Sequence, residues 1–100
     1  MALLSEHEVR DALASLPEWR VEDGQLRKTL GFASFADAVA FLVRVAFDAE
    51  AADHHPDVFL RYRRLTISWW THTEGGVTAK DVAGARAVER LLATSRGVST

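Results

Sequence analysis

Apolar residues recur every three or four positions in three segments of the chain, the spacing that places them on one side of an α-helix. Each segment follows a Ser or Thr with an acidic residue three positions later, the pattern of a helix capping box. The first helix is predicted to begin after Ser5 and to end before Pro17. The second is predicted to run from Ser34 to about Ala51, and the third to begin after Thr78.

Between these helices apolar and polar residues alternate, which is the pattern of β-strands that bury one face. Asp23-Gly24 is a common pair in the tight turn of a hairpin. A second hairpin is predicted after Pro56, with its turn at Arg63-Arg64. The side chains predicted to face the core from these strands are Leu26, Lys28, Leu30, Phe32, Leu65, Ile67 and Trp69.

The predicted elements follow the order α-β-β-α-β-β-α. We therefore expect a single α+β domain over residues 1–100, with a four-stranded antiparallel sheet and three helices on one face. Trp70 and His72 alternate with the core-facing positions, so they should lie on the other face of the sheet. A large aromatic side chain there fits a ligand-binding wall, a subunit interface or a partly covered surface residue.

The composition narrows the functional classes. The chain has no cysteine, which excludes a disulfide framework, a thiolate zinc site and a cysteine nucleophile. Its formal net charge of −2 gives no basic footprint for nucleic acid, and the short run of Arg61, Arg63 and Arg64 is interpreted as a solvated turn. No signal peptide or membrane-spanning stretch is recognisable. We expect a cytoplasmic protein that binds neither nucleic acid nor membrane directly.

Titratable side chains concentrate around one X-Pro bond. His54 and His55 precede Pro56, and with His72 they are three of the four histidines. An unperturbed imidazole has a pKa of ~6.5, so such a cluster suits proton transfer near neutral pH. Pro56 favours an extended conformation at His55, so the two neighbouring rings should project in different directions. Asp53 is close enough in sequence to stabilise an imidazolium.

Two acidic residues near this cluster each have a structural alternative. Glu50 precedes His54 by four positions, so both would lie on one face if the helix persists that far. This pair is equally compatible with an ordinary helix-end contact and with a functional role. Asp81 occupies the third position of the capping box that begins at Thr78, which explains it without any chemistry. A functional Asp81 requires the start of the third helix to border the site.

Other chemistries are less well supported. Adjacent histidines before a proline seldom converge on one metal ion, and the chain has no His-x-His or His-x₃-His pair. A serine nucleophile is also disfavoured, because no Gly-x-Ser-x-Gly elbow occurs. We therefore expect acid–base chemistry without a bound metal.

The chain resembles the pterin-4a-carbinolamine dehydratases in the identity and spacing of its site residues. The matching positions are Glu50, His54, His55, Pro56, Tyr62, His72 and Asp81. The resemblance extends over nearly the whole chain and includes the order of the elements. It departs from the family at Trp69-Trp70, where smaller or aliphatic residues are expected. That departure would alter the pterin pocket or the subunit contact.

This resemblance implies a dehydratase that removes water from a 4a-hydroxytetrahydropterin and gives the quinonoid dihydropterin. Both proton transfers are within reach of imidazoles, and no cofactor is required. His54, His55 and His72 would be catalytic, with His54 as the main proton-transfer group. The residues that would bind the substrate or orient the imidazoles are Trp19, Glu50, Asp53, Pro56, Thr71, Thr73 and Asp81.

The resemblance also implies partners. Family members are typically homodimers or homotetramers, so we expect a homo-oligomer, with a functional link to an aromatic amino acid hydroxylase. Two alternatives remain open. The chain could be a protein-binding dimerisation or coactivator module of the same fold, or an accessory protein of a pterin or molybdopterin pathway.

Overall fold

The computed structural model describes residues 2–95 and 98–99. Its elements are α1 (Glu6–Leu13), β1 (Arg20–Glu22), β2 (Gln25–Phe32), α2 (Phe35–Ala52), β3 (Asp57–Arg61), β4 (Arg64–Trp69), α3 (Ala79–Ala93) and β5 (Val98–Ser99). The order α-β-β-α-β-β-α is confirmed. The structure adds β5, a two-residue strand that the sequence pattern does not predict.

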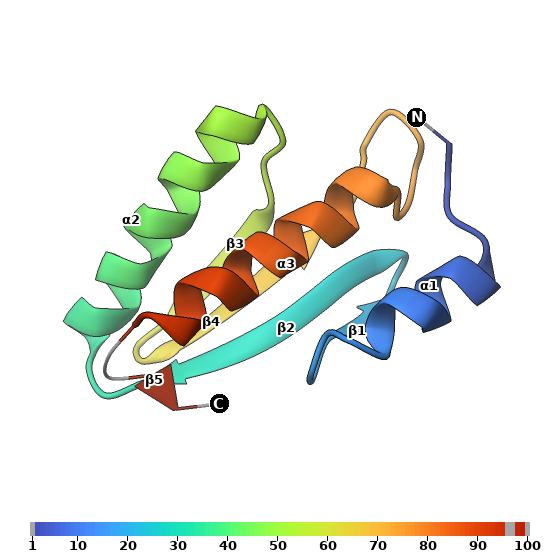
Figure 1. Cartoon of the computed structure of the whole chain (residues 1–100). Coiled ribbons are helices and arrows are strands. Elements are labelled where there is room, and N and C mark those ends of the chain that lie inside the picture. Colours follow the sequence, from blue (N-terminus) through green and yellow to red (C-terminus); the bar gives the residue numbers. More distant parts are fainter. Residues whose placement is uncertain (1, 96–97, 100) are drawn as a thin grey trace.

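The sheet is antiparallel throughout, with the strand order β1-β2-β4-β3, and β5 pairs with the end of β2. β2 and β4 are the central strands, and α2 and α3 lie side by side across one face of them, with α1 beside β1 (Figure 1). The turn between β1 and β2 has positive φ at both Asp23 (54°) and Gly24 (73°), as a tight two-residue hairpin turn requires. The predicted α+β architecture is therefore confirmed.

Side-chain hydrogen bonds define where the helices begin. Ser5 and Thr78 form complete capping boxes with Glu8 and Asp81. The Ser5 backbone N–H donates to Glu8, and this bond is the main reason that the pKa of the Glu8 carboxyl lies below its ordinary value. The cap of α2 is simpler than predicted. Ser34 Oγ accepts from the backbone N–H of Asp37, but the reciprocal bond is not among the contacts of the described residues.

The core lies between the sheet and the helices. All seven side chains predicted to face it from β2 and β4 are buried. One of them is the cation Lys28, whose Nζ donates to Pro17 O and Glu89 Oε2, each at 2.9 Å. The indole Nε1 of Trp19 donates to the same Glu89 oxygen at 2.9 Å. Among the described residues, no helix is long and apolar enough to cross a membrane.

Candidate active site

The end of α2 determines where His54 lies. Asp53 adopts a left-handed conformation (φ 52°, ψ 41°) directly after Ala52, the last residue of the helix. Its backbone N–H still bonds to the helix, and so does that of His54, which donates to Ala49 O at 3.2 Å. Aspartate tolerates this conformation better than most residues. The reversal directs the His54 ring toward the start of α3, where it is largely buried.

His54 and Asp81 form the central pair of the site. His54 Nε2 lies 2.6 Å from Asp81 Oδ1, and the Asp81 side chain is completely buried. An ionised carboxylate can only accept, so Nε2 carries the proton of this bond when Asp81 is ionised. In a neutral imidazole the other ring nitrogen, Nδ1, is then a free proton acceptor. This arrangement can orient His54 and present it as a base.

The second oxygen of Asp81 caps α3. Oδ2 accepts from the backbone N–H of Thr78 and from Thr71 Oγ1, each at 2.8 Å. The hydroxyl groups of Thr71 and Thr78 are also 2.8 Å apart. The predicted capping role of Asp81 is therefore present, and it coexists with the contact to His54 because different oxygens are used. The start of α3 borders His54, as a functional Asp81 would require.

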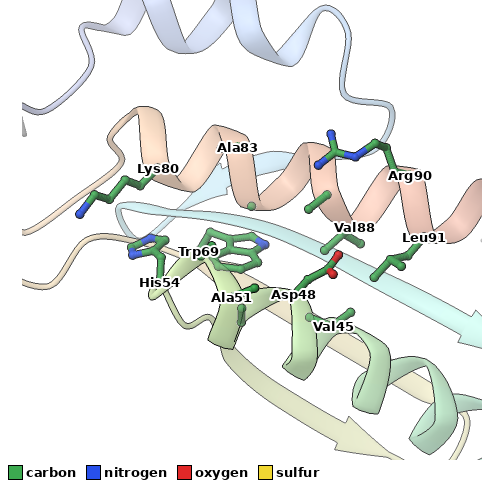
Figure 2. Close-up of a pocket in the computed structure, with 14 residues that line it drawn as sticks. Val45, Asp48, Ala51, His54, Trp69, Lys80, Ala83, Val88, Arg90 and Leu91 are labelled. Atoms are coloured by element: carbon green, nitrogen blue, oxygen red, sulfur yellow. The ribbon is translucent and has the colours of Figure 1, made fainter.

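His54 also lines a cavity of about 520 Å³ between α2 and α3. Its imidazole stacks on Trp69, with ring centroids 5.6 Å apart and planes 19° from parallel. Figure 2 shows both rings under α3, with Lys80 at the His54 end of the cavity and Asp48 and Arg90 farther along. A cavity of this size can hold a small organic molecule.

His55 points elsewhere and pairs with Glu50. Its Nε2 contacts Glu50 Oε2, and both side chains are more than half exposed. The prediction that Glu50 would reach His54 along one helix face is wrong. The helix ends at Ala52, and the left-handed turn at Asp53 rotates His54 away from the Glu50 side.

His72 lies beyond the end of β4 and is exposed, as the strand alternation predicts. Its ring stacks on Trp70 with centroids 3.9 Å apart, and Trp70 Nε1 donates to Asp57 Oδ2 at 2.7 Å. The contacts of the described residues do not join His72 to His54 directly. Thr71, its neighbour in sequence, connects the two histidines through its bond to Asp81.

The remaining predicted residues occupy varied positions. Asp53 is exposed at the end of α2, and Pro56 is partly buried just before β3. Thr73 is exposed in the loop before α3, with its hydroxyl 3.5 Å from Glu74 Oε2. Trp19 is buried in the core and does not line the cavity at His54. Tyr62 follows β3 at the end opposite Pro56, so the structure does not bring it to the histidines.

The sequence predicted Trp69 as a core residue and, with Trp70, as a departure that would alter the pterin pocket or the subunit contact, but it did not predict that Trp69 lines a cavity and stacks on His54. Its unusual size at this position was the available signal. Asp48, Lys80 and Arg90 were not predicted, because single charged residues on exposed helix faces carry no distinguishing pattern. Among residues 2–95 and 98–99, no group of three His, Cys, Asp or Glu side chains is arranged to hold a metal ion.

Comparison with known proteins identifies close relatives. Residues 2–91 match the family model described as pterin 4 alpha carbinolamine dehydratase. A protein of Chloroflexus aurantiacus that carries the name pterin-4-alpha-carbinolamine dehydratase provisionally is 44% identical over 92 residues, which cover 92% of this chain and 99% of that protein. A provisionally named relative from Mycolicibacterium vanbaalenii is 45% identical, with the same coverage of both chains.

A solved structure shares the fold. The crystal structure of a transcriptional coactivator/pterin dehydratase from Brucella melitensis superposes with a TM-score of 0.84 at 35% sequence identity. The match covers 89% of this chain and 97% of that one.

Proposed function

The chain belongs to the pterin-4a-carbinolamine dehydratase family, and from this premise we propose that it removes water from a 4a-hydroxytetrahydropterin by histidine acid–base catalysis. The observation that carries the proposal is the buried His54–Asp81 pair at the edge of a cavity of about 520 Å³. The substrate would bind at this edge, between the loop that carries His54 and the loop that carries His72.

The reaction needs two proton transfers. The C4a–O bond breaks as the hydroxyl group receives a proton and leaves as water. The proton on N5 goes to a base, and the N5–H electrons form the C4a=N5 double bond of the quinonoid product. His54 suits the role of base, because its bond to Asp81 leaves Nδ1 as an acceptor. A protonated His55 or His72 would supply the acid.

The remaining predicted residues would position these groups. Glu50 contacts His55 and would orient its ring, while Asp81 holds His54. Thr71, bonded to Asp81, keeps the carboxylate in place. Asp53, Pro56 and Thr73 would border the substrate. Trp19 is buried and donates to Glu89, so its proposed contribution is to the packing of the core and not to direct contact with the substrate.

The variant His54→Ala tests the proposal. Its kcat, measured by stopped-flow dehydration of a freshly generated 4a-hydroxytetrahydropterin, should fall by about 10²-fold or more, because general acid–base groups contribute roughly 10²–10⁴. His7→Ala is the matched control, since His7 is exposed on α1 and lies 3.4 Å from Asp11, far from His54 in the sequence. Turnover by His54→Ala within about twofold of the unmodified protein contradicts the assignment.

A protein-binding role is the second candidate, because the Brucella melitensis structure is described as a transcriptional coactivator as well as a pterin dehydratase. We also propose that the chain forms a homodimer or homotetramer. Phe47 and Val43 on the outer side of α2 are 73% and 48% exposed, and association would remove them from water. Sedimentation of a clean monomer at micromolar concentration would contradict the oligomer.

A further inference from the structure

Three arginines gather at the turn between β3 and β4 without visible compensation. The strand register places Arg61 directly opposite Arg64, and Arg63 lies in the turn between them. Like charges directly opposite one another destabilise a β-ladder. Among residues 2–95 and 98–99, none of the three has a carboxylate within 4 Å. All three arginines are exposed, as expected for a solvated turn.

The other arginines on the open face of the sheet are paired differently. Arg20 and Arg27 both donate to Glu22, at 3.0 and 2.6 Å. These bonds, first that of Arg20, hold the pKa of the Glu22 carboxyl below its ordinary value. One end of this face is therefore neutralised internally, whereas the end at the β3–β4 turn keeps its positive charge although the chain as a whole has a net charge of −2.

These three arginines line a hollow of about 580 Å³. Its wall is formed by Arg61, Tyr62, Arg63 and Arg64, and its floor includes Gly31 of β2. Gly31 is the register partner of Arg64, so the position beside this guanidinium carries no side chain. Gly31 and Arg64 both line the hollow.

Tyr62 adds an aromatic group to this hollow. Tyr62 is the first residue of the two-residue hairpin turn, which accounts for its positive φ of 52°, and the residue is 67% exposed. The Arg63 guanidinium carbon lies 5.1 Å from the ring centroid, within the range of a cation–π contact.

We propose that the hollow at the β3–β4 turn binds a diphosphate group, as inorganic pyrophosphate or as the diphosphate of an aromatic ester. Guanidinium groups bind phosphoryl oxygens through paired N–H donors, and two facing arginines can each take one phosphoryl group. The bound anion relieves the repulsion between Arg61 and Arg64. The exposed ring of Tyr62 offers a stacking surface for an aromatic ester.

This site is separate from the proposed dehydratase site. The hollow lies at one end of β4 and Trp69 at the other, about 17 Å away for six residues of strand. The proposals of diphosphate binding and of pterin dehydration can therefore be tested separately, and either one can be wrong without affecting the other.

Isothermal titration calorimetry of the full chain with inorganic pyrophosphate, at an ionic strength held constant with sodium chloride, tests the proposal. Saturable binding of one pyrophosphate per chain is expected. The double variant Arg61→Gln/Arg64→Gln should weaken it by at least about tenfold, because charge-assisted bonds to both guanidinium groups are lost. Arg86→Gln on α3 is the control, since within the described part of the chain the Arg86 side chain donates to Ser15, and the affinity of this variant for pyrophosphate should be unchanged.

A parallel titration with ADP distinguishes the two sources of the diphosphate. Tighter binding of ADP than of pyrophosphate identifies an aromatic ester that uses Tyr62, and equal binding identifies the diphosphate alone. Without ligand, the double variant should melt at the same or a higher temperature, because repulsion is removed. The proposal is overturned by the absence of saturable binding, by an equal loss of affinity in Arg86→Gln, or by a lower melting temperature of the double variant.

Discussion

Asp81 combines two roles because its two carboxylate oxygens face different neighbours. Oδ2 closes the first turn of α3 by accepting from the Thr78 N–H, and Oδ1 contacts His54 Nε2. A buried carboxylate in this position is stabilised by hydrogen bonds on both sides, which offsets the cost of removing it from water. The same residue therefore connects the folding of a helix to the orientation of an imidazole.

The variant Asp81→Asn separates these two roles. The amide oxygen can still cap Thr78, which leaves the amide NH₂ facing His54 Nε2. That nitrogen must then accept, so the proton moves to Nδ1 and the proposed base is lost. We expect kcat to fall by about 10²-fold or more, with a loss of only about 1 kcal/mol in the free energy of unfolding.

Dehydration kinetics and urea unfolding of the same preparations measure both effects. Asp37→Asn is the matched control, because Asp37 has the equivalent position in the first turn of α2 and, among the residues that the structure describes, contacts no histidine. Its kcat should match that of the unmodified protein. An Asp81→Asn variant with full kcat would show that the carboxylate serves only as a cap.

The two contacts of Asp81, with Thr78 and with His54, differ in whether they could be predicted from the sequence. The cap of α3 was predictable because Thr78 and Asp81 are three positions apart, within one helical turn. The contact between His54 and Asp81 spans 27 positions, so no local pattern reveals it. Local geometry also explains the error at Glu50, since one left-handed residue at Asp53 changed which histidine it meets.

At the scale of elements, strand alternation predicted the buried face of β2 and β4, including Lys28. This success follows from the two-residue period, which leaves no freedom in the direction of successive side chains. β5 could not be predicted in the same way, because two residues are too few to show alternation. Its pairing with the end of β2 depends on the tertiary structure.

The contact between β4 and α3 depends on a complementary pair, Trp69 and Gly84. Glycine inside a helix costs roughly 1 kcal/mol relative to alanine, so its presence in α3 requires a reason. A Cβ atom at Gly84 would lie 2.6 Å from two ring atoms of Trp69. The large side chain of β4 and the missing side chain of α3 therefore fit together.

Gly84→Ala should therefore destabilise the protein, although alanine is the better helix former. We expect a loss of about 1–3 kcal/mol in the free energy of unfolding, because the added methyl group meets the fused bond of a buried ring. The shift of Trp69 should also disturb the stacked His54 and lower kcat.

Urea unfolding of Gly84→Ala, Trp69→Leu and the double variant measures this coupling. The smaller leucine leaves room for the methyl group, so the double variant should lose less stability than the sum of the two single losses. Strictly additive losses, or a more stable Gly84→Ala, would show that the two residues do not constrain each other.

At the scale of the whole molecule, one carboxylate joins three distant segments. Glu89 of α3 accepts from Lys28 of β2 and from Trp19, and Lys28 also donates to the carbonyl of Pro17. The helical and strand patterns predicted the elements of Glu89 and Lys28, whereas Trp19 lies just before β1. The meeting of these residues depends on how α3 crosses the sheet. The periodicity of apolar residues along the sequence does not predict such long-range polar contacts.

Replacing Glu89 should lower the free energy of unfolding more than replacing Lys28. Glu89→Ala leaves the Lys28 ammonium buried with only one carbonyl and the Trp19 N–H without a partner, so we expect a loss of about 3 kcal/mol in the free energy of unfolding. Lys28→Met keeps most of the side-chain volume, and Glu89 is 24% exposed and can be hydrated, so the loss should stay within about 1 kcal/mol. Urea unfolding at pH 7 compares the two, and a Lys28→Met variant as unstable as Glu89→Ala would show that the buried cation itself stabilises the fold.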